Sequence, residues 1–171
     1  MSSPSSTHNL KDIDPGTRVF IDANIFIYHF TTSLFTAICT SFLERIETNE
    51  LHGVTSSVIL AEVSHRLMVL EAIDRFQFPS KTTVKKLKEK PDLVKQLSKY
   101  VSAANKISDF NVHIEPVAFN HLIIGQQLSA QHGLLTNDSL TAALMHSLGL
   151  TNIATNNTDL ERLPNITIWK P

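Results

Sequence analysis

The sequence is poor in cysteine, glycine and long apolar runs, and each shortage excludes a class of protein. Cys39 is the single cysteine among 171 residues, which excludes an internal disulfide framework and a cysteine-rich zinc site. With only 5 glycines, the chain has no glycine-rich phosphate-binding loop. No apolar run approaches the roughly 18 residues of a transmembrane helix, so we expect no membrane span.

Charge and length point to one globular domain. The chain carries 15 Lys+Arg against 16 Asp+Glu, and a net charge of −1 excludes a globally basic nucleic-acid coat protein. Residues 1–16 are polar and resemble neither a signal peptide nor an anchor, so we expect a flexible N-terminal segment on a cytoplasmic protein. Residues 17–171 then suit a single domain.

Strand-like and helix-like patterns alternate along that domain. The expected strands cover residues 18–22, 53–55, 111–115, 152–155 and 166–169. The expected helices cover residues 23–30, 35–49, 57–73, 92–110, 118–132 and 139–148. This alternation predicts an α/β fold around a central, mostly parallel sheet. Residues 81–110 are rich in lysine and are expected to form a basic helical arm inserted in the domain.

Acidic and amide side chains follow two of the expected strands. Asp22 and Asn24 come after the first strand, and residues 156–159 come after the fourth. The carboxyl ends of parallel strands meet at one edge of a sheet, where ligands commonly bind. Asp138 begins a helix at a similar level, and Glu62 lies within a helix, where an unpaired buried carboxylate is costly.

Each acid also has a purely structural interpretation. Asp22 or Asp138 could cap the helix that follows, and Glu62 could pair with Arg66 one turn later. Asp159 could be a solvated loop residue. The combination favours a site, because converging carboxylates repel one another unless a divalent cation compensates their charge.

Four segments carry a family resemblance. They are Val19-Phe-Ile-Asp22-Ala-Asn24, Leu60-Ala-Glu62, Leu134-Leu-Thr-Asn-Asp138-Ser-Leu140, and residues 153–164. Together they resemble the PIN-domain ribonucleases, and within them the VapC-type toxins of prokaryotic toxin–antitoxin pairs. The resemblance runs from Arg18 to Pro171 with the motifs in family order. It implies a three-layer α/β/α domain and hydrolysis of RNA phosphodiester bonds.

The resemblance also implies a site of three or four acids around one or two Mg²⁺ or Mn²⁺ ions. Asp22, Glu62 and Asp138 match the first three acids, with Asp22 and Asp138 as the main metal ligands and Glu62 as a ligand or water-orienting group. The fourth position departs from the pattern. Asn157 stands where the family usually has an aspartate, and Asp159 matches a second, auxiliary acid.

Further expectations attach to the same resemblance. Asn24 and Thr155 could hold the carboxylates or position waters, and Asn157 would act outside the metal's direct ligands. A cognate antitoxin would be a partner, and the protein would form homodimers. The lysine-rich arm is either a solvated helix face or an RNA-binding element, with Lys85, Lys86 and Lys88 as the RNA contacts.

Two other functions remain open from the sequence. The fold could be kept by an RNA-binding module whose catalysis is weakened by Asn157. Alternatively, Phe20-Ile-Asp22-Ala-Asn24 superficially resembles the nucleophile strand of haloacid-dehalogenase-type phosphatases. That family expects a second aspartate where Asn24 stands, so the resemblance ends there.

Overall fold

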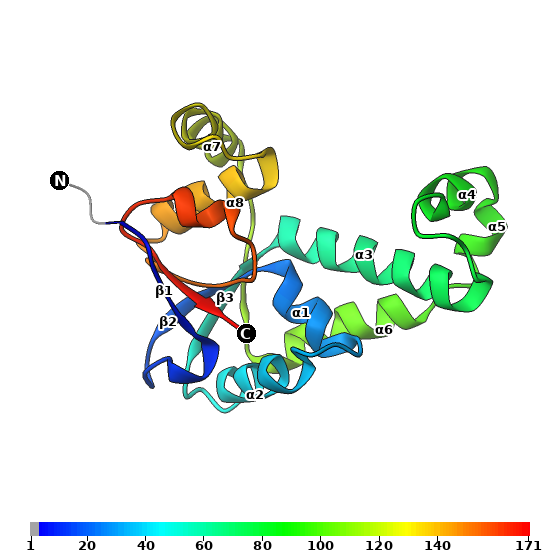
Figure 1. Ribbon diagram of the computed structural model, residues 1–171, viewed down its shortest axis with the longest axis horizontal. Coiled ribbons are helices and arrows are strands. Elements are labelled where there is room, and N and C mark those ends of the chain that lie inside the picture. Colours follow the sequence, from blue (N-terminus) through cyan, green and yellow to red (C-terminus); the bar gives the residue numbers. More distant parts are fainter. Residues whose placement is uncertain (1–3) are drawn as a thin grey trace.

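A computed structural model describes residues 4–171 as an α/β domain built on one sheet (Figure 1). The strands are β1 (Ser6–Asn9), β2 (Arg18–Ile21), β3 (His52–Ser56), β4 (His113–Glu115), β5 (Asn152–Ala154) and β6 (Thr167–Lys170). Over the described residues they form a six-stranded sheet in the order β1-β6-β5-β2-β3-β4, with every neighbouring pair parallel. The expectation of a mostly parallel sheet is confirmed.

Helices cover both sides of the sheet, which gives the three layers. The helices are α1 (Ala23–Phe30), α2 (Thr36–Glu47), α3 (Ser57–Phe76), α4 (Thr83–Glu89), α5 (Pro91–Val94), α6 (Lys99–Asn105), α7 (Phe119–His132) and α8 (Thr136–Ser147), with 3₁₀ turns η1 (Leu10–Asp12), η2 (Lys106–Phe110) and η3 (Asp159–Arg162). Figure 1 shows α7 and α8 stacked on one side, and α1, α2, α3 and α6 grouped on the other. Among the described residues, no helix combines the length and apolarity needed to cross a membrane.

The middle of the sheet is buried on both faces, as its sequence predicts. Val19, Phe20 and Ile21 of β2 are fully buried, which fits a continuous apolar run in a parallel strand rather than an alternating one. Gly53 lets β3 approach α2, because a Cβ there would lie 2.9 Å from Ile46 Cγ2. Asp22 follows directly after this buried strand, which ends at Ile21.

The N-terminal segment differs from the expectation of a flexible region. Ser6–Asn9 form β1, which pairs in parallel with β6 at the edge of the sheet. Leu10 and Ile13 are buried in the main core, and the His8 ring lies 5.2 Å from the Trp169 ring, centroid to centroid. Burial of these side chains stabilises the segment, so residues 6–13 belong to the sheet and its core, while residues 1–3 of the expected flexible segment lie outside the described residues.

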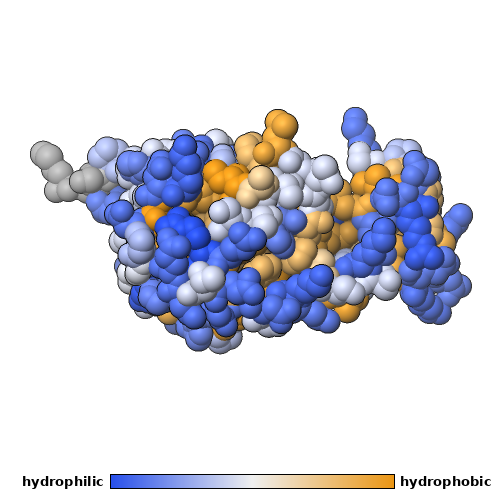
Figure 2. Space-filling model, turned by 90° about the horizontal axis from the view of Figure 1, so that it is seen from below, coloured by the Kyte–Doolittle hydropathy of each residue, from blue (hydrophilic) through white to orange (hydrophobic). Residues whose placement is uncertain are grey.

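The lysine-rich arm also differs in detail from its prediction. The expected helix over residues 92–110 is divided into α5, α6 and η2. The buried carboxylate of Glu71, on α3, accepts the backbone N–H groups of Ser98 and Tyr100, each at 3.0 Å. These bonds begin a new helix at Lys99. The arm therefore turns back along α3, with α4 and α5 at the far end of α3 from the sheet (Figure 1). Figure 2 shows hydrophilic and hydrophobic surface side by side at that end of the molecule.

Candidate functional site

Asp22 is the one residue between β2 and α1, and its carboxylate accepts hydrogen bonds from α1 and from the loop after β5. The residue caps α1, where its Oδ1 accepts the backbone N–H of Ala23 at 2.7 Å. Its Oδ2 accepts one bond from Asn24 Nδ2 at 2.7 Å and another from Thr155 Oγ1 at 2.6 Å. Asp22 is thus the capping residue of α1, and the same hydrogen bonds fix its carboxylate at the carboxyl end of β2.

Asn24 and Thr155 connect this carboxylate to the loop after β5. Asn24 Nδ2 also donates to Thr155 Oγ1 at 3.1 Å, and Asn24 Oδ1 accepts the backbone N–H of Asn156 at 3.1 Å. Thr155 is fully buried and accepts the backbone N–H of Asn157 at 2.9 Å. Both side chains therefore hold the Asp22 carboxylate and shape the loop after β5.

Asp138 and Asn157 meet on the other side of the site. Asp138 lies in the first turn of α8, which begins at Thr136, so it is not the capping residue. Asn157 Nδ2 donates to Asp138 Oδ1 at 2.8 Å, while Asn157 Oδ1 accepts the backbone N–H of Asp159 at 2.9 Å. The amide at position 157 therefore orients Asp138 instead of adding a charge beside it.

Glu62 enters the same site from the second turn of α3. Asn137 Nδ2 donates to Glu62 Oε2 at 3.4 Å, and Arg66 NH1 lies 3.8 Å from Glu62 Oε1. The expected pairing with Arg66 is present but loose. The surrounding pocket measures about 520 Å³ and is lined by Asp22, Ala23, Asn24, Ile59, Glu62, Arg66, Leu135, Thr136, Asn137, Asp138, Thr141 and Asn157.

The structure therefore brings together three of the four acids named from the sequence. Asp22, Glu62 and Asp138 share one pocket. Asp159 stands outside the lining residues, in η3, where its Oδ1 pairs with Arg162 NH2 at 2.8 Å. Its charge still acts on the site, because it contributes to raising the pKa of Asp138.

The pocket carboxylates have an electrostatic cost. Burial raises the pKa of Asp22, although bonds from Thr155 and Ala23 oppose that rise. Burial also raises the pKa of Asp138, and the charges of Asp22, Asp159 and Glu62 raise it further. A site that holds repelling carboxylates close together is suited to a cation that relieves the repulsion.

The donor set fits a hard divalent cation. Carboxylate oxygens line the pocket without any cysteine or histidine, and such ligands are what Mg²⁺ and Mn²⁺ prefer. Within residues 4–171, no three His, Cys, Asp or Glu side chains are drawn tightly enough together to form a ready-made metal cage. Mg²⁺ commonly takes one or two carboxylates directly and keeps several waters, so a looser set of acids is compatible with it.

The lysines proposed as RNA contacts lie elsewhere. Lys85, Lys86 and Lys88 stand on α4, which packs through Leu87 against Ala72 in the C-terminal half of α3. Lys86 Nζ sits 4.5 Å from the centre of the Phe78 ring, and Lys85 Nζ lies 3.8 Å from Glu89. None of the three lysines lines the pocket described above.

Arg66 and Asn137 line the pocket with polar side chains that the sequence did not assign to the site. Arg66 entered only as a partner for Glu62, and Asn137 only as the neighbour of Asp138. A signal was available for Arg66, since four residues after Glu62 on a helix is the same face. Asn137 bonds across to α3, a contact that no local pattern indicates.

Solved structures of toxin–antitoxin proteins share this fold. VapBC2 of Rickettsia felis, bound to a DNA fragment from its promoter, aligns at a TM-score of 0.56 with 19% identity, covering 90% of this chain and 98% of that one. VapC20 of Mycobacterium tuberculosis, described as a Sarcin-Ricin loop cleaving toxin, aligns at 0.56 with 14% identity, covering 83% and 92%. A toxin–antitoxin complex of Klebsiella pneumoniae aligns at 0.54 with 13% identity, covering 86% and 94%.

Sequence comparison gives a family assignment independent of these structures. No curated protein sequence matches the chain. The family model of the PIN domain does match, over residues 19–166, which include all four of the acids discussed above. The matched range begins in β2 and ends just before β6, so β1 lies outside it. On this match, which spans most of the chain, the protein belongs to the PIN domain family.

Proposed function

We propose that this protein is a metal-dependent endoribonuclease and the toxin of a toxin–antitoxin pair. The observation that carries the proposal is the convergence of Asp22, Glu62 and Asp138 on one pocket at the carboxyl edge of β2. The raised pKa values of Asp22 and Asp138 support it, because perturbed carboxylates in a pocket are typical of functional sites. Membership of the PIN domain family supports the nuclease class.

The roles follow from how each side chain is held. A bound Mg²⁺ or Mn²⁺ would polarise the phosphodiester and lower the pKa of a coordinated water. Asp22 and Asp138 would be its main ligands, and Glu62 would bind it or orient a water. Asn24 and Thr155 fix Asp22 through the bonds described above, while Asn157 fixes Asp138. Asp159 would contribute negative charge from outside the pocket.

The partners are part of the same proposal. Two of the similar structures are complexes that contain an antitoxin, which supports a cognate antitoxin for this chain. We also expect a homodimer that acts on RNA in the cytoplasm. Lys85, Lys86 and Lys88 would contact RNA only if the substrate extends from the pocket along α3, because α4 stands at the far end of that helix (Figure 1).

An RNA-cleavage assay with Mg²⁺, Mn²⁺ or EDTA tests the activity. Wild-type protein should cut RNA only with metal, and Asp22→Asn and Asp138→Asn should each abolish the cut while leaving the fold intact. Asp109→Asn is the matched control, since it removes the same charge from an exposed position in η2. Wild-type rates in both pocket variants would reject the assignment.

A second candidate function is favoured by one observation, the neutral amide at position 157. An RNA-binding module with weakened catalysis would keep the pocket but bind metal poorly, because Asn157 adds no charge. Calorimetric titration with Mn²⁺ separates the two. Metal binding that is lost in Asp138→Asn supports the nuclease, and no detectable binding by wild type supports the module.

A further inference from the structure

Among the described residues that line the acidic pocket, Arg66 is the one with a cationic side chain. The other lining residues are three acids and eight neutral side chains. Arg66 stands one helical turn after Glu62 on α3, and its side chain lines the pocket together with Asp22 and Glu62. An RNA backbone is repelled by carboxylates, so a permanent positive charge beside them has a direct use in binding.

Among the described residues, the Arg66 guanidinium makes no contact that the fold needs for its stability. Its nearest acid is Glu62 at 3.8 Å, beyond hydrogen-bond distance, and its side chain is 55% exposed. Within residues 4–171 it makes no hydrogen bond to the protein. By contrast, Arg45 donates to Ile13 O at 2.6 Å and to Glu50 at 2.8 Å, and Arg162 donates to Gly133 O at 2.8 Å.

A guanidinium at the pocket that makes no hydrogen bond to the described residues can bind a particular class of ligand. Its five N–H donors lie in one plane and match two oxygens of a phosphate or carboxylate at once. Glu62 keeps the group near the pocket through charge alone, so the arginine can exchange this loose partner for a ligand at little cost. The ligand must be an anion that can approach Arg66 from its exposed side, away from the neighbouring acids, as a phosphodiester of an RNA strand crossing the pocket can.

We propose that Arg66 binds a phosphate of the RNA substrate at the mouth of the acidic pocket and so positions the strand for cleavage. This inference rests on the ribonuclease function proposed above and adds a residue to it. Arg66 is a binding and positioning residue here. Its contribution is an electrostatic contact that does not depend on bound metal, and this property makes it separable from the carboxylates in an experiment.

RNA affinity without metal is the test. The probe is a fluorescein-labelled 20-nucleotide single-stranded RNA of mixed sequence, titrated in EDTA at several KCl concentrations. All variants carry Asp22→Asn so that no cleavage can occur. Arg66→Gln should weaken binding about tenfold and reduce the slope of log affinity against log salt by roughly 0.7, the value for one lost phosphate contact on a single strand.

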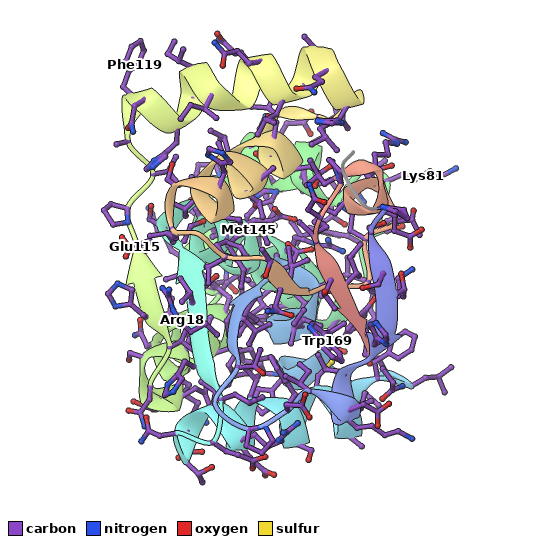
Figure 3. All side chains as sticks on the ribbon, turned by 90° about the vertical axis from the view of Figure 1, so that its left-hand side faces the viewer. Arg18, Lys81, Glu115, Phe119, Met145 and Trp169 are labelled. Atoms are coloured by element: carbon purple, nitrogen blue, oxygen red, sulfur yellow. The ribbon has the colours of Figure 1, made fainter. Side chains whose placement is uncertain are left out.

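Two further variants separate a phosphate contact from a structural effect. Arg66→Lys keeps the charge, so it should retain the salt slope while losing part of the affinity. Arg18→Gln removes the same charge from an exposed arginine at the opposite end of β2 and should match the parent (Figure 3). If Arg66→Gln binds RNA with the same affinity and slope as Arg18→Gln, the proposal is overturned.

Steady-state cleavage kinetics with metal separate the role of Arg66 from the ribonuclease activity itself. In the otherwise wild-type protein, Arg66→Gln should raise KM about tenfold and change kcat by less than about threefold. If wild type cleaves RNA and Arg66→Gln has the same KM as Arg18→Gln, the proposed role of Arg66 is rejected while the ribonuclease proposal stands. If wild type neither binds nor cleaves RNA, the ribonuclease proposal fails and this inference fails with it.

Discussion

Asn157 donates a 2.8 Å hydrogen bond from its amide to Oδ1 of Asp138, so a neutral donor faces a carboxylate whose pKa is raised. The family resemblance places an aspartate at position 157. A carboxylate there would repel Asp138, whereas the amide stabilises its charged form. An asparagine at position 157 therefore lowers the electrostatic cost of the metal-free protein, and it also removes negative charge that would attract a cation.

Replacing Asn157 by aspartate should reverse both effects. Without metal, Asn157→Asp should lower the stability by about 1 kcal/mol, because a hydrogen bond is lost and a repulsion is added. With Mn²⁺, the variant should gain more thermal stability than wild type does, because its affinity for the ion is higher. Thermal denaturation with and without Mn²⁺ measures both. A metal-induced shift in Tm equal to that of wild type would contradict the prediction.

Removing the Asp138 charge should stabilise the protein without metal while ending its function. A folded-state pKa raised above the unfolded value means that stability is greater at low pH and is lost as pH rises through the folded pKa. At pH 7.5 the charged carboxylate is therefore unfavourable, and Asp138→Asn should raise Tm in EDTA by roughly 2 °C. Asn157 can still donate to the remaining carbonyl oxygen.

The matched control for that measurement is Asp109→Asn. It removes one negative charge from an exposed position away from the pocket, so it should leave Tm close to wild type. If Asp138→Asn proves less stable than Asp109→Asn in EDTA, the pocket does not hold the repulsion inferred for it.

Much of the site was predictable because it depends on local sequence. A buried apolar run predicts β2, and the residue that ends such a strand stands at the sheet edge, so Asp22 followed directly. Gly133 ends α7 with a φ of 68°, as its position in the sequence indicates. Asp138 lies in the same pocket as Asp22, although α8 begins earlier than the capping interpretation required.

The parts that sequence reasoning missed depend on contacts between distant residues. β1 has four exposed residues and no alternating pattern, and it becomes a strand only through pairing with β6. The helix break before Lys99 is caused by Glu71, which lies 27 positions before Ser98 in the chain. A run of lysines likewise gives no direction in space, so the distance between α4 and the pocket could not be predicted.

Glu71 should therefore control the stability of the arm. Burial alone would raise its pKa, but hydrogen bonds from the backbone of Ser98 and Tyr100 outweigh burial and lower it. A depressed folded pKa contributes stability above the ordinary value of 4.5, and that stability is lost as pH falls through the folded pKa. Glu71→Gln should cost roughly 2 kcal/mol of local stability at neutral pH, because the bonds to a charged acceptor are weakened.

Hydrogen exchange of the arm amides measures this effect. Amides of residues 98–105 should exchange faster in Glu71→Gln, while those of β2 should stay protected. Glu89→Gln is the control, because Glu89 is an exposed acid of the same arm that only pairs loosely with Lys85 at 3.8 Å. Equal exchange rates in the two variants would show that the Glu71 bonds do not hold α6 in place.

His29 should make the domain less stable in mild acid. Its ring packs against Phe30 and Phe110, with centroids at 4.7 Å and 5.1 Å, and its Nδ1 lies 2.9 Å from Thr40 Oγ1. Burial lowers the pKa of His29, and Glu44 only partly offsets that effect. Because the unfolded chain then binds the proton more tightly, the contribution of His29 to stability is complete above the unfolded value of 6.5 and is lost as pH falls below it.

Denaturant unfolding between pH 7.5 and 5 tests the role of His29. As pH falls across this range, the stability of wild type should decrease relative to that of His29→Gln, because the variant has no proton to take up on unfolding at that position. Near pH 7.5 the free energies of unfolding of the two proteins should differ only by a constant that reflects the changed packing. His52→Gln, at an exposed position of β3, should follow the wild-type slope. Parallel stability curves for wild type and His29→Gln would mean that protonation of His29 is not coupled to unfolding.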